Sequence, residues 1–216
     1  SIAVGEEGGF APNFTTNMDA IEAISEAVVQ KNLKLGMDVF LGLDVASSSF
    51  FKDSRYHIKD ASHALSKDEY MEFILKLTKN YPLLCLEDPL NEDDFEGWSK
   101  LLKTMSQDIY LIGDDLLATN KDRLEKAIKE KACSMALIKP NQIGTISETL
   151  DVIHTAKKND IAVLVSHRSG ETNDSFIADL AVGVQADFVK FGAPSRGERV
   201  AKYNRLLEIE REKLSK

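Results

Sequence analysis

The chain has 216 residues, of which 43% are apolar and 29% charged, a composition typical of a globular protein with room for one sizeable core. Its formal net charge of −8 argues against broad binding to nucleic acid or anionic membranes, although not against a local basic site. No apolar run approaches the ~18 residues of a membrane span, and no signal-peptide pattern opens the sequence. Cys85 and Cys133 lie in apolar stretches without metal-type spacing, so we expect buried free thiols and a cytoplasmic protein.

Apolar runs and amphipathic segments alternate along the chain. We expect strands, buried on both faces as in a parallel sheet, at residues 39–46, 83–90, 109–117, 134–142, 161–169 and 187–195. We expect helices at residues 18–31, 67–80, 121–132, 145–159, 173–185 and 196–214. This alternation predicts an α/β fold without a domain linker.

A titratable side chain lies toward the C-terminal end of every predicted strand, and this pattern favours a barrel over an open sheet. The strand-end residues are Asp44, Glu87, Asp114, Lys139, His167 and Lys190. In a TIM-type (β/α) barrel such ends converge on one active-site mouth. An open sheet would usually carry a Gly-rich loop after its first strand, and no G-x-G-x-x-G motif occurs there. Because a full barrel has eight strands, we predict an incomplete TIM-type barrel with about six of them.

Three of these strand ends carry carboxylates: Asp44, Glu87 and Asp114. Oxygen ligands on successive strands suit a hard cation, and Mg²⁺ fits because it uses few protein ligands and keeps several waters. Each acid taken alone is more often a helix cap or a loop residue. Their repeated position favours the metal site, with Asp88 and Asp115 as supporting or capping neighbours.

Two strand ends carry lysines, Lys139 and Lys190, which we expect to be partly buried. Burial lowers the pKa of a lysine and can make its amine a base near neutral pH. The alternative is that either amine merely pairs with a metal-site carboxylate. A lysine base next to a divalent cation suits removal of a proton beside a carboxylate.

The segment "LVSHRSGETND" places His167, Arg168 and Ser169 where the fifth predicted strand meets a helix. If two strands precede those seen, this is strand seven, and phosphate sites in such barrels favour the loops after strands seven and eight. A guanidinium can bind a phosphate through two parallel hydrogen bonds. Gly170, which has no side chain, lets the backbone approach a bound anion closely. We therefore predict a phosphate or carboxylate anchor. The glycine-flanked pair Glu6 and Glu7 would by itself indicate only a solvated turn.

Taken together, these motifs resemble enolase (phosphopyruvate hydratase). The matching segments are "VGEEGGFAPN", "LEDPL", "GDDLLATN", "IKPNQIGT", "VSHRSGETND", "FIADLAVG" and "KFGAPSRGERVAKYNRLLEIE". They occur in the family's order and span essentially all 216 residues. "SHRSGET" with "NQIG" is highly specific, since other branches of the superfamily carry different base motifs. Small departures include Glu6, Ser49 and Pro140, the last directly after the lysine that matches the base.

The resemblance implies a lyase of glycolysis that reversibly dehydrates 2-phosphoglycerate to phosphoenolpyruvate with Mg²⁺. It implies Lys139 as the base at C2 and Glu7 as the general acid for the 3-hydroxyl. The ligands of the metal would be Asp44, Glu87 and Asp114. The substrate contacts would be His167, Arg168, Ser169 and Lys190, with Arg168 and Ser169 on the phosphate and Lys190 on the carboxylate.

The resemblance also sets expectations for the whole protein. We expect residues 1–216 to be part of the enolase C-terminal barrel domain, with the family's N-terminal α+β domain absent and this fragment inactive alone. The full-length protein would form homo-oligomers and would bind neither nucleic acid nor membranes. The alternative is a non-catalytic enolase-like scaffold for a partner protein, against which the retained set of site residues argues.

Overall fold

The computed structural model describes residues 3–214 and divides into two compact units. The first comprises the described residues of Ser1–Asn13, Ala118–Lys121 and Ala136–Lys216. The second comprises Phe14–Leu117 and Asp122–Met135. Among the described residues, no helix is both long and apolar enough to cross a membrane.

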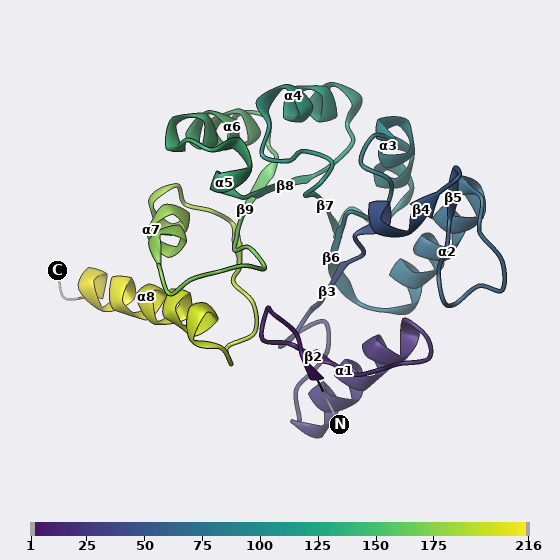
Figure 1. Ribbon diagram of the computed structural model, residues 1–216, viewed down its shortest axis with the longest axis horizontal. Helices are drawn as coiled ribbons and strands as arrows, with labels where there is room; N and C mark the ends of the chain where they lie inside the picture. Colours follow the sequence, from purple (N-terminus) through teal and green to yellow (C-terminus); the bar gives the residue numbers. More distant parts are fainter. Residues whose placement is uncertain (1–2, 215–216) are drawn as a thin grey trace. The chain divides into compact units, whose positions relative to one another are not determined.

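The second unit contains the elements from α1 to α4 (Figure 1). Its helices are α1 (Met18–Gln30), α2 (Lys67–Asn80), α3 (Phe95–Thr104) and most of α4 (Lys121–Glu130), with a 3-10 turn η1 (Ser47–Phe50). Its strands are β3 (Leu41–Asp44), β4 (Phe51–Lys52), β5 (Arg55–Tyr56), β6 (Leu83–Glu87) and β7 (Tyr110–Gly113). The buried residues of its core include Trp98, Leu101 and Leu124, each with 0% exposure.

The first unit contains the remaining elements. Its strands are β1 (Ala3–Val4), β2 (Phe10–Ala11), most of β8 (Met135–Ile138), β9 (Ala162–Ser166) and β10 (Phe188–Lys190). Its helices are α5 (Pro140–Ile143), α6 (Ile146–Lys158), α7 (Phe176–Gly183) and α8 (Gly197–Leu214). Apolar residues of β8 and β9 are almost completely buried, as expected for strands covered on both faces.

Six strands form one sheet in the order β10-β9-β8-β7-β6-β3. The pairs β3–β6, β6–β7 and β9–β10 are parallel, and helices separate the strands along the chain (Figure 1). All six predicted strands are present, and each predicted helix is found within a few residues of its expected ends. The predicted α/β class is therefore confirmed.

Several features were not predicted from the sequence: helix α3, the short pair β1–β2, the hairpin β4–β5, the 3-10 turn η1 and the short helix α5, which begins at Pro140 inside the strand expected over 134–142. The hairpin turns through Asp53 and Ser54, both at positive φ (50° and 58°), which is the backbone that a two-residue type I′ turn requires. One expectation about the thiols was wrong in part. Cys133 is buried, but Cys85 is only half-buried.

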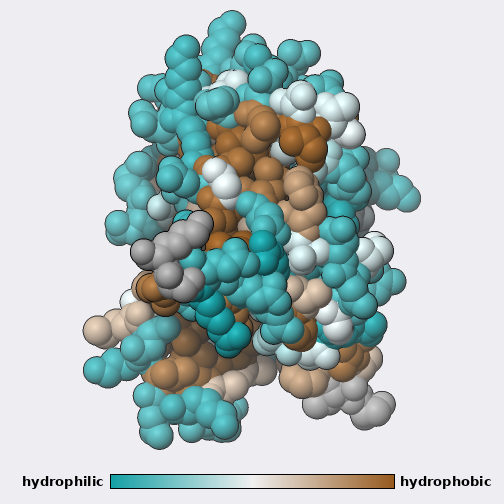
Figure 2. All heavy atoms as spheres, turned by 90° about the vertical axis from the view of Figure 1, so that its left-hand side faces the viewer, coloured by the Kyte–Doolittle hydropathy of each residue, from teal (hydrophilic) through white to brown (hydrophobic). Residues whose placement is uncertain are grey.

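Apolar side chains also reach the surface. Figure 2 shows the side of the molecule where α7 and α8 lie, with apolar residues among hydrophilic ones. In the first unit the exposed apolar residues include Ile146, Leu150 and Phe176, which are 39–46% accessible. Exposed apolar side chains of this size are ordinary on protein surfaces, so they assign no function by themselves.

Candidate active site

The three predicted metal carboxylates lie in the second unit, where parallel strands end side by side. Asp44 ends β3 and Glu87 ends β6, and the two residues are partners in the β3–β6 register. Glu87 in turn pairs with Ile112 of β7, two residues before Asp114. Glu87 (4% exposed) and Asp114 (7%) are buried, whereas Asp44 is exposed. The strand register thus brings the three strand ends to one edge of this part of the sheet.

Asp88, next to Glu87, holds the backbone at this edge through hydrogen bonds. It lies at φ 42°, and its carboxylate accepts hydrogen bonds from the backbone N–H groups of Asp114 (2.9 Å) and Asp115 (2.7 Å). Burial raises the pKa of Asp88 to about 7, and those two backbone bonds act in the opposite direction. The sequence-based expectation of a supporting role for Asp88 fits these bonds.

Among the described residues, the carboxylates of Asp88, Asp114 and Asp115 can each bring an oxygen within 4.8 Å of one another. This group shares only Asp114 with the predicted ligands Asp44, Glu87 and Asp114. Both groups consist of hard oxygen donors, and most of their members are buried. Buried carboxylates repel one another unless a cation or a proton compensates them. The donor chemistry of this edge therefore fits a hard divalent cation.

Lys139 lies in the first unit, at the end of β8 and at the N-cap of α5, and it is half-buried as expected. Its backbone N–H donates to Thr119 Oγ1 (2.9 Å), whose hydroxyl donates to Gln142 Oε1 (2.8 Å). Pro140 occupies the first position of α5, where the missing N–H and fixed φ of proline are well tolerated. This departure from the family pattern therefore suits the local backbone.

The loop after β9 brings two predicted residues, His167 and Ser169, next to Glu7. Glu7 Oε2 lies 3.5 Å from Nε2 of His167, and Glu7 Oε1 accepts from Ser169 Oγ at 3.3 Å. The backbone N–H of His167 donates to the carbonyl of Lys190 (2.9 Å), so the end of β10 adjoins the same loop. Arg168 points its Nη1 at Asn141 Oδ1 (2.7 Å). Residues that lie 162 positions apart in the chain thus form one polar cluster.

His167 is 2% exposed, and its environment favours the neutral imidazole. Burial lowers the pKa of His167, and the positive charges of Arg199 and Lys190 lower it further, while Glu7 and Glu171 act in the opposite direction. A buried neutral imidazole carries a proton on only one ring nitrogen, so its hydrogen-bond partners decide which one.

Two buried cations of α8 were missed by the sequence analysis. Arg199 and Lys202 are both 0% exposed. Lys202 Nζ donates to the carbonyl of Thr172 (2.6 Å) and pairs with Glu171 Oε2 (2.7 Å). Glu171 Oε1 accepts from the backbone N–H of Arg168 (3.0 Å). The helix therefore holds the loop after β9 through buried charged side chains.

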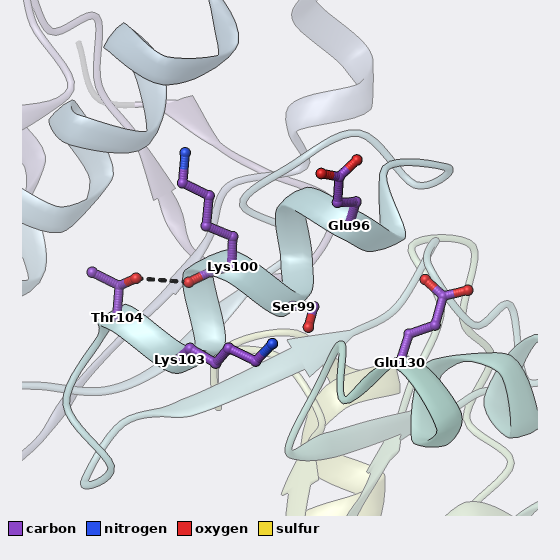
Figure 3. Close-up of a pocket in the computed structure, with 6 residues that line it drawn as sticks. All are labelled: Glu96, Ser99, Lys100, Lys103, Thr104 and Glu130. Carbon is purple, nitrogen blue, oxygen red and sulfur yellow. Dashed lines mark hydrogen bonds between the residues drawn. The ribbon is translucent and has the colours of Figure 1, made fainter.

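A separate hollow lies away from all these residues. It has a volume of about 550 Å³ and is lined by Glu96, Ser99, Lys100, Lys103, Thr104 and Glu130 (Figure 3). The carboxylates and ammonium groups drawn on α3 and α4 do not point toward one common position. The hydroxyl of Thr104 donates a hydrogen bond to the carbonyl of Lys100 (2.7 Å). None of the predicted site residues lines it, so it is no part of the candidate active site.

Comparison with known proteins decides the family. The model of the enolase C-terminal TIM barrel domain matches residues 1–216. The chain belongs to the enolase C-terminal TIM barrel family. It is 49% identical to the enolase of Helicobacter pylori (strain HPAG1) over 211 residues, which are 97% of this chain and 50% of that protein. It is 48% identical to the enolase of Natranaerobius thermophilus over 212 residues, 98% of this chain and 50% of that protein.

The enolase of a Nitratiruptor species is also 48% identical over 212 residues, which are 98% of this chain and 50% of that protein. The chain spans about half the length of these curated relatives. The predicted fold, an incomplete TIM barrel of the enolase type, agrees with the six-stranded sheet and with the family. The sequence resemblance to enolase is thereby confirmed.

Proposed function

We propose that this enolase-family barrel carries the catalytic residues of an enzyme that reversibly dehydrates 2-phosphoglycerate to phosphoenolpyruvate, a lyase step of glycolysis. The support is membership of the family together with the retained set of polar residues at the strand ends. The chain spans half the length of its relatives. We therefore propose this activity for the whole protein and not for residues 1–216 alone.

In this proposal the residues of the first unit carry out the proton transfers and hold the substrate. Lys139, half-buried at the end of β8, removes the proton from C2. Glu7 protonates the departing 3-hydroxyl, and in the reverse direction its carboxylate accepts a proton from the attacking water. Arg168 and Ser169 bind the phosphate, Lys190 binds the carboxylate, and His167 lines the site next to Glu7.

We further propose Asp44, Glu87 and Asp114 as the ligands of Mg²⁺. The bound ion would supply positive charge that stabilises the doubly charged enediolate formed when C2 loses its proton. Hard oxygen donors and the burial of Glu87 and Asp114 support a divalent cation at this edge of the sheet. Asp88 keeps the backbone of Asp114 and Asp115 in place through its two hydrogen bonds.

The observation that carries the proposal is the convergence of Glu7, His167 and Ser169. An acidic loop near the start of the chain is a solvated turn in the absence of a partner. Here it lies against an imidazole that is 2% exposed and against a hydroxyl in a loop suited to binding phosphate. A scaffold protein would have no need of this cluster, which argues against the non-catalytic alternative.

The test is an absorbance assay of phosphoenolpyruvate formation from 2-phosphoglycerate, with Mg²⁺ supplied and the longest polypeptide that the gene encodes. We expect activity, and we expect Lys139→Ala to reduce kcat by a factor of at least about 10² because the base is gone. Lys129→Ala, at an exposed lysine of the second unit, is the matched control. Absence of activity in the unaltered protein would overturn the proposal and would favour the scaffold.

The remaining proposals concern the setting of the enzyme. We propose a cytoplasmic protein that forms homo-oligomers in its longest form and binds neither nucleic acid nor membranes. The net charge of −8 supports the last point. Light scattering of the purified protein measures the oligomeric state, and a monomer at all concentrations would contradict this part of the proposal.

A further inference from the structure

Arg199 is a buried cation that no part of the proposed chemistry uses. It lies in the first turns of α8 and is 0% exposed. Arginine remains protonated in proteins, so a buried guanidinium needs several acceptors to offset its lost hydration. The acceptors found here all come from the loops that carry the candidate catalytic residues.

The guanidinium joins two loops of the first unit. Its Nη1 donates to the carbonyl of Arg168 (2.7 Å), and its Nη2 donates to the carbonyls of Ser169 (2.7 Å) and Glu6 (3.0 Å). Glu6 directly precedes Glu7, and Arg168 and Ser169 follow His167. One side chain therefore holds the backbone on both sides of the Glu7–His167 contact.

The same guanidinium also contacts the imidazole. Nη1 lies 2.8 Å from Nδ1 of His167. Because a guanidinium has donors and no acceptor, this bond requires an unprotonated Nδ1. The proton of the neutral ring is then on Nε2, which lies 3.5 Å from Oε2 of Glu7. That distance is longer than a normal hydrogen bond, as is common for catalytic contacts before substrate binds.

Gly192 leaves the space for this arrangement. It lies at φ +81°, and a Cβ there would be 2.7 Å from the carbonyl oxygen of Glu7, 2.8 Å from Cδ of Arg199 and 2.9 Å from Cε1 of His167. Three groups of the cluster thus meet at a residue that has no side chain. The packing leaves little freedom for either the guanidinium or the ring to turn.

We propose that Arg199 is a positioning residue that fixes His167 as the neutral tautomer with its proton on Nε2, directed at the Glu7 carboxylate, and that clamps the two loops bearing them. The tautomer follows from the geometry alone. The consequence for catalysis rests on the proposed function. There, a ring that can only donate toward Glu7 orients that carboxylate for proton exchange at the 3-hydroxyl.

The first test measures the tautomer without any assay of activity. Nitrogen-15 NMR of the imidazole rings distinguishes a protonated from an unprotonated ring nitrogen, and His167→Gln identifies the signals of His167 among the four histidines. We expect an unprotonated Nδ1 and a protonated Nε2 at neutral pH. A proton on Nδ1 in the unaltered protein would overturn the proposal, even if no variant of Arg199 folds.

The second test replaces the guanidinium. Arg199→Met keeps much of the side-chain length but removes the charge and all donors, so we expect the ring of His167 to populate both tautomers. Arg199→Lys keeps one cationic donor group and should restore part of the single-tautomer signal. Arg205→Met is the matched control, since Arg205 lies on the same helix and pairs with Asp179 and Glu208 instead of the cluster. An unchanged His167 signal in folded Arg199→Met would contradict the proposal.

Kinetics then separate this inference from the proposed function. In an active enzyme we expect Arg199→Met to lower kcat by about 10²-fold with a smaller change in KM, because misplacement of reacting groups by about 1 Å costs that much. The kcat of Arg199→Lys should lie between that of the unaltered protein and that of Arg199→Met. If the unaltered protein lacks enolase activity, the proposed function fails while the NMR result still decides the tautomer. If it is active and folded Arg199→Met keeps kcat, the positioning role fails alone.

Discussion

Burial and neighbouring charge together keep His167 neutral in the folded chain. The pKa of this imidazole is lowered first by burial, and then by the cations Arg199 and Lys190. In the unfolded chain the same ring titrates near its ordinary pKa of about 6.5. At pH values below about 6.5 the unfolded state therefore binds a proton that the folded state does not, and folding loses stability as the pH falls.

We accordingly predict that His167→Gln changes the pH dependence of the free energy of unfolding. The stability of the unaltered protein relative to the variant should decrease between about pH 7 and pH 5, and should be constant above about pH 7. Urea unfolding at a series of pH values measures this difference. His57→Gln, at an exposed loop position, controls for removal of an imidazole. A stability difference that does not change with pH would show that folding does not lower the pKa of His167.

Gly192 permits a second prediction at the scale of one residue. We predict that Gly192→Ala destabilises the protein by more than the roughly 1–2 kcal/mol that a left-handed backbone costs a residue with a side chain. The additional loss arises because the new methyl group would overlap the Glu7 carbonyl, Arg199 and His167. Denaturant unfolding measures the stability, and the NMR signals of His167 report displacement of the ring.

Two other glycines separate the causes. Gly144 has a positive φ of +99° with open space at its Cβ, so Gly144→Ala measures the backbone cost alone. Gly183, at the end of α7, has neither a positive φ nor a close neighbour, so Gly183→Ala should be neutral or stabilising. Equal losses for Gly192→Ala and Gly144→Ala would mean that the cluster accommodates the methyl group.

At the scale of elements, local signals account for what the sequence could predict. The start of α2 is an example, because Ser66 and Glu69 form a capping box. The Ser66 hydroxyl accepts from the backbone N–H of Glu69 (3.4 Å), and Glu69 Oε2 accepts from the backbone N–H of Ser66 (2.8 Å). Such a pattern depends only on residues three positions apart, so the predicted helix over 67–80 has the bounds found in the structure.

We predict that Ser66→Ala lowers the stability of the protein by about 1 kcal/mol, because an orphan N–H of the first turn loses its acceptor. Thermal or urea unfolding measures the loss. Thr78→Ala, in the last turn of the same helix, is the control and should cost little, since alanine is the better helix former. A Ser66→Ala variant as stable as the control would show that the cap adds nothing to the packing of α2.

Helix α3 shows where local signals fail. Gly97 stands in its first turn, and glycine lowers the helix propensity that a sequence reading depends on. In the structure a Cβ at Gly97 would lie 2.3 Å from Asp94 Oδ2 and 2.9 Å from Cε of Lys67. Asp94 caps the helix at the N–H of Gly97 (3.0 Å) and also binds Lys67 Nζ, which lies 27 residues away in the sequence. The glycine is thus explained by a tertiary ion pair that the local pattern does not contain.

The candidate site divides in the same way. Residues at strand ends, such as Lys139 and His167, could be named from the sequence because the end of a buried run is visible in the pattern. Arg199 could not, because it lies in a helix whose charged residues alternate without showing which side chain points inward. The contact between Glu7 and His167 joins distant parts of the chain, so only the resemblance to a family gave Glu7 a role before the structure.

At the scale of the whole molecule, charge distribution links cation binding to folding. The chain has a net charge of −8, and three of its buried polar side chains are the carboxylates of Glu87, Asp88 and Asp114. A bound cation would offset the repulsion between like charges that lie close together. A cation that binds the folded state alone stabilises it by an amount that increases with its concentration.

We therefore predict that Mg²⁺ raises the Tm of the chain in a saturable manner, as the proposed metal site requires. At a Mg²⁺ concentration about 100 times its Kd, the free energy of unfolding should increase by about 2.7 kcal/mol. Asp114→Asn should remove most of the shift, because it deletes a charged oxygen donor and leaves the backbone bond to Asp88 possible. Asp108→Asn, at an exposed acid just before the start of β7, should keep it. NaCl at matched ionic strength is the control that separates specific binding from charge screening. If the Tm rises equally with NaCl and with MgCl₂, the stabilisation comes from screening of the net charge, and the prediction of an ion bound to the carboxylates is wrong.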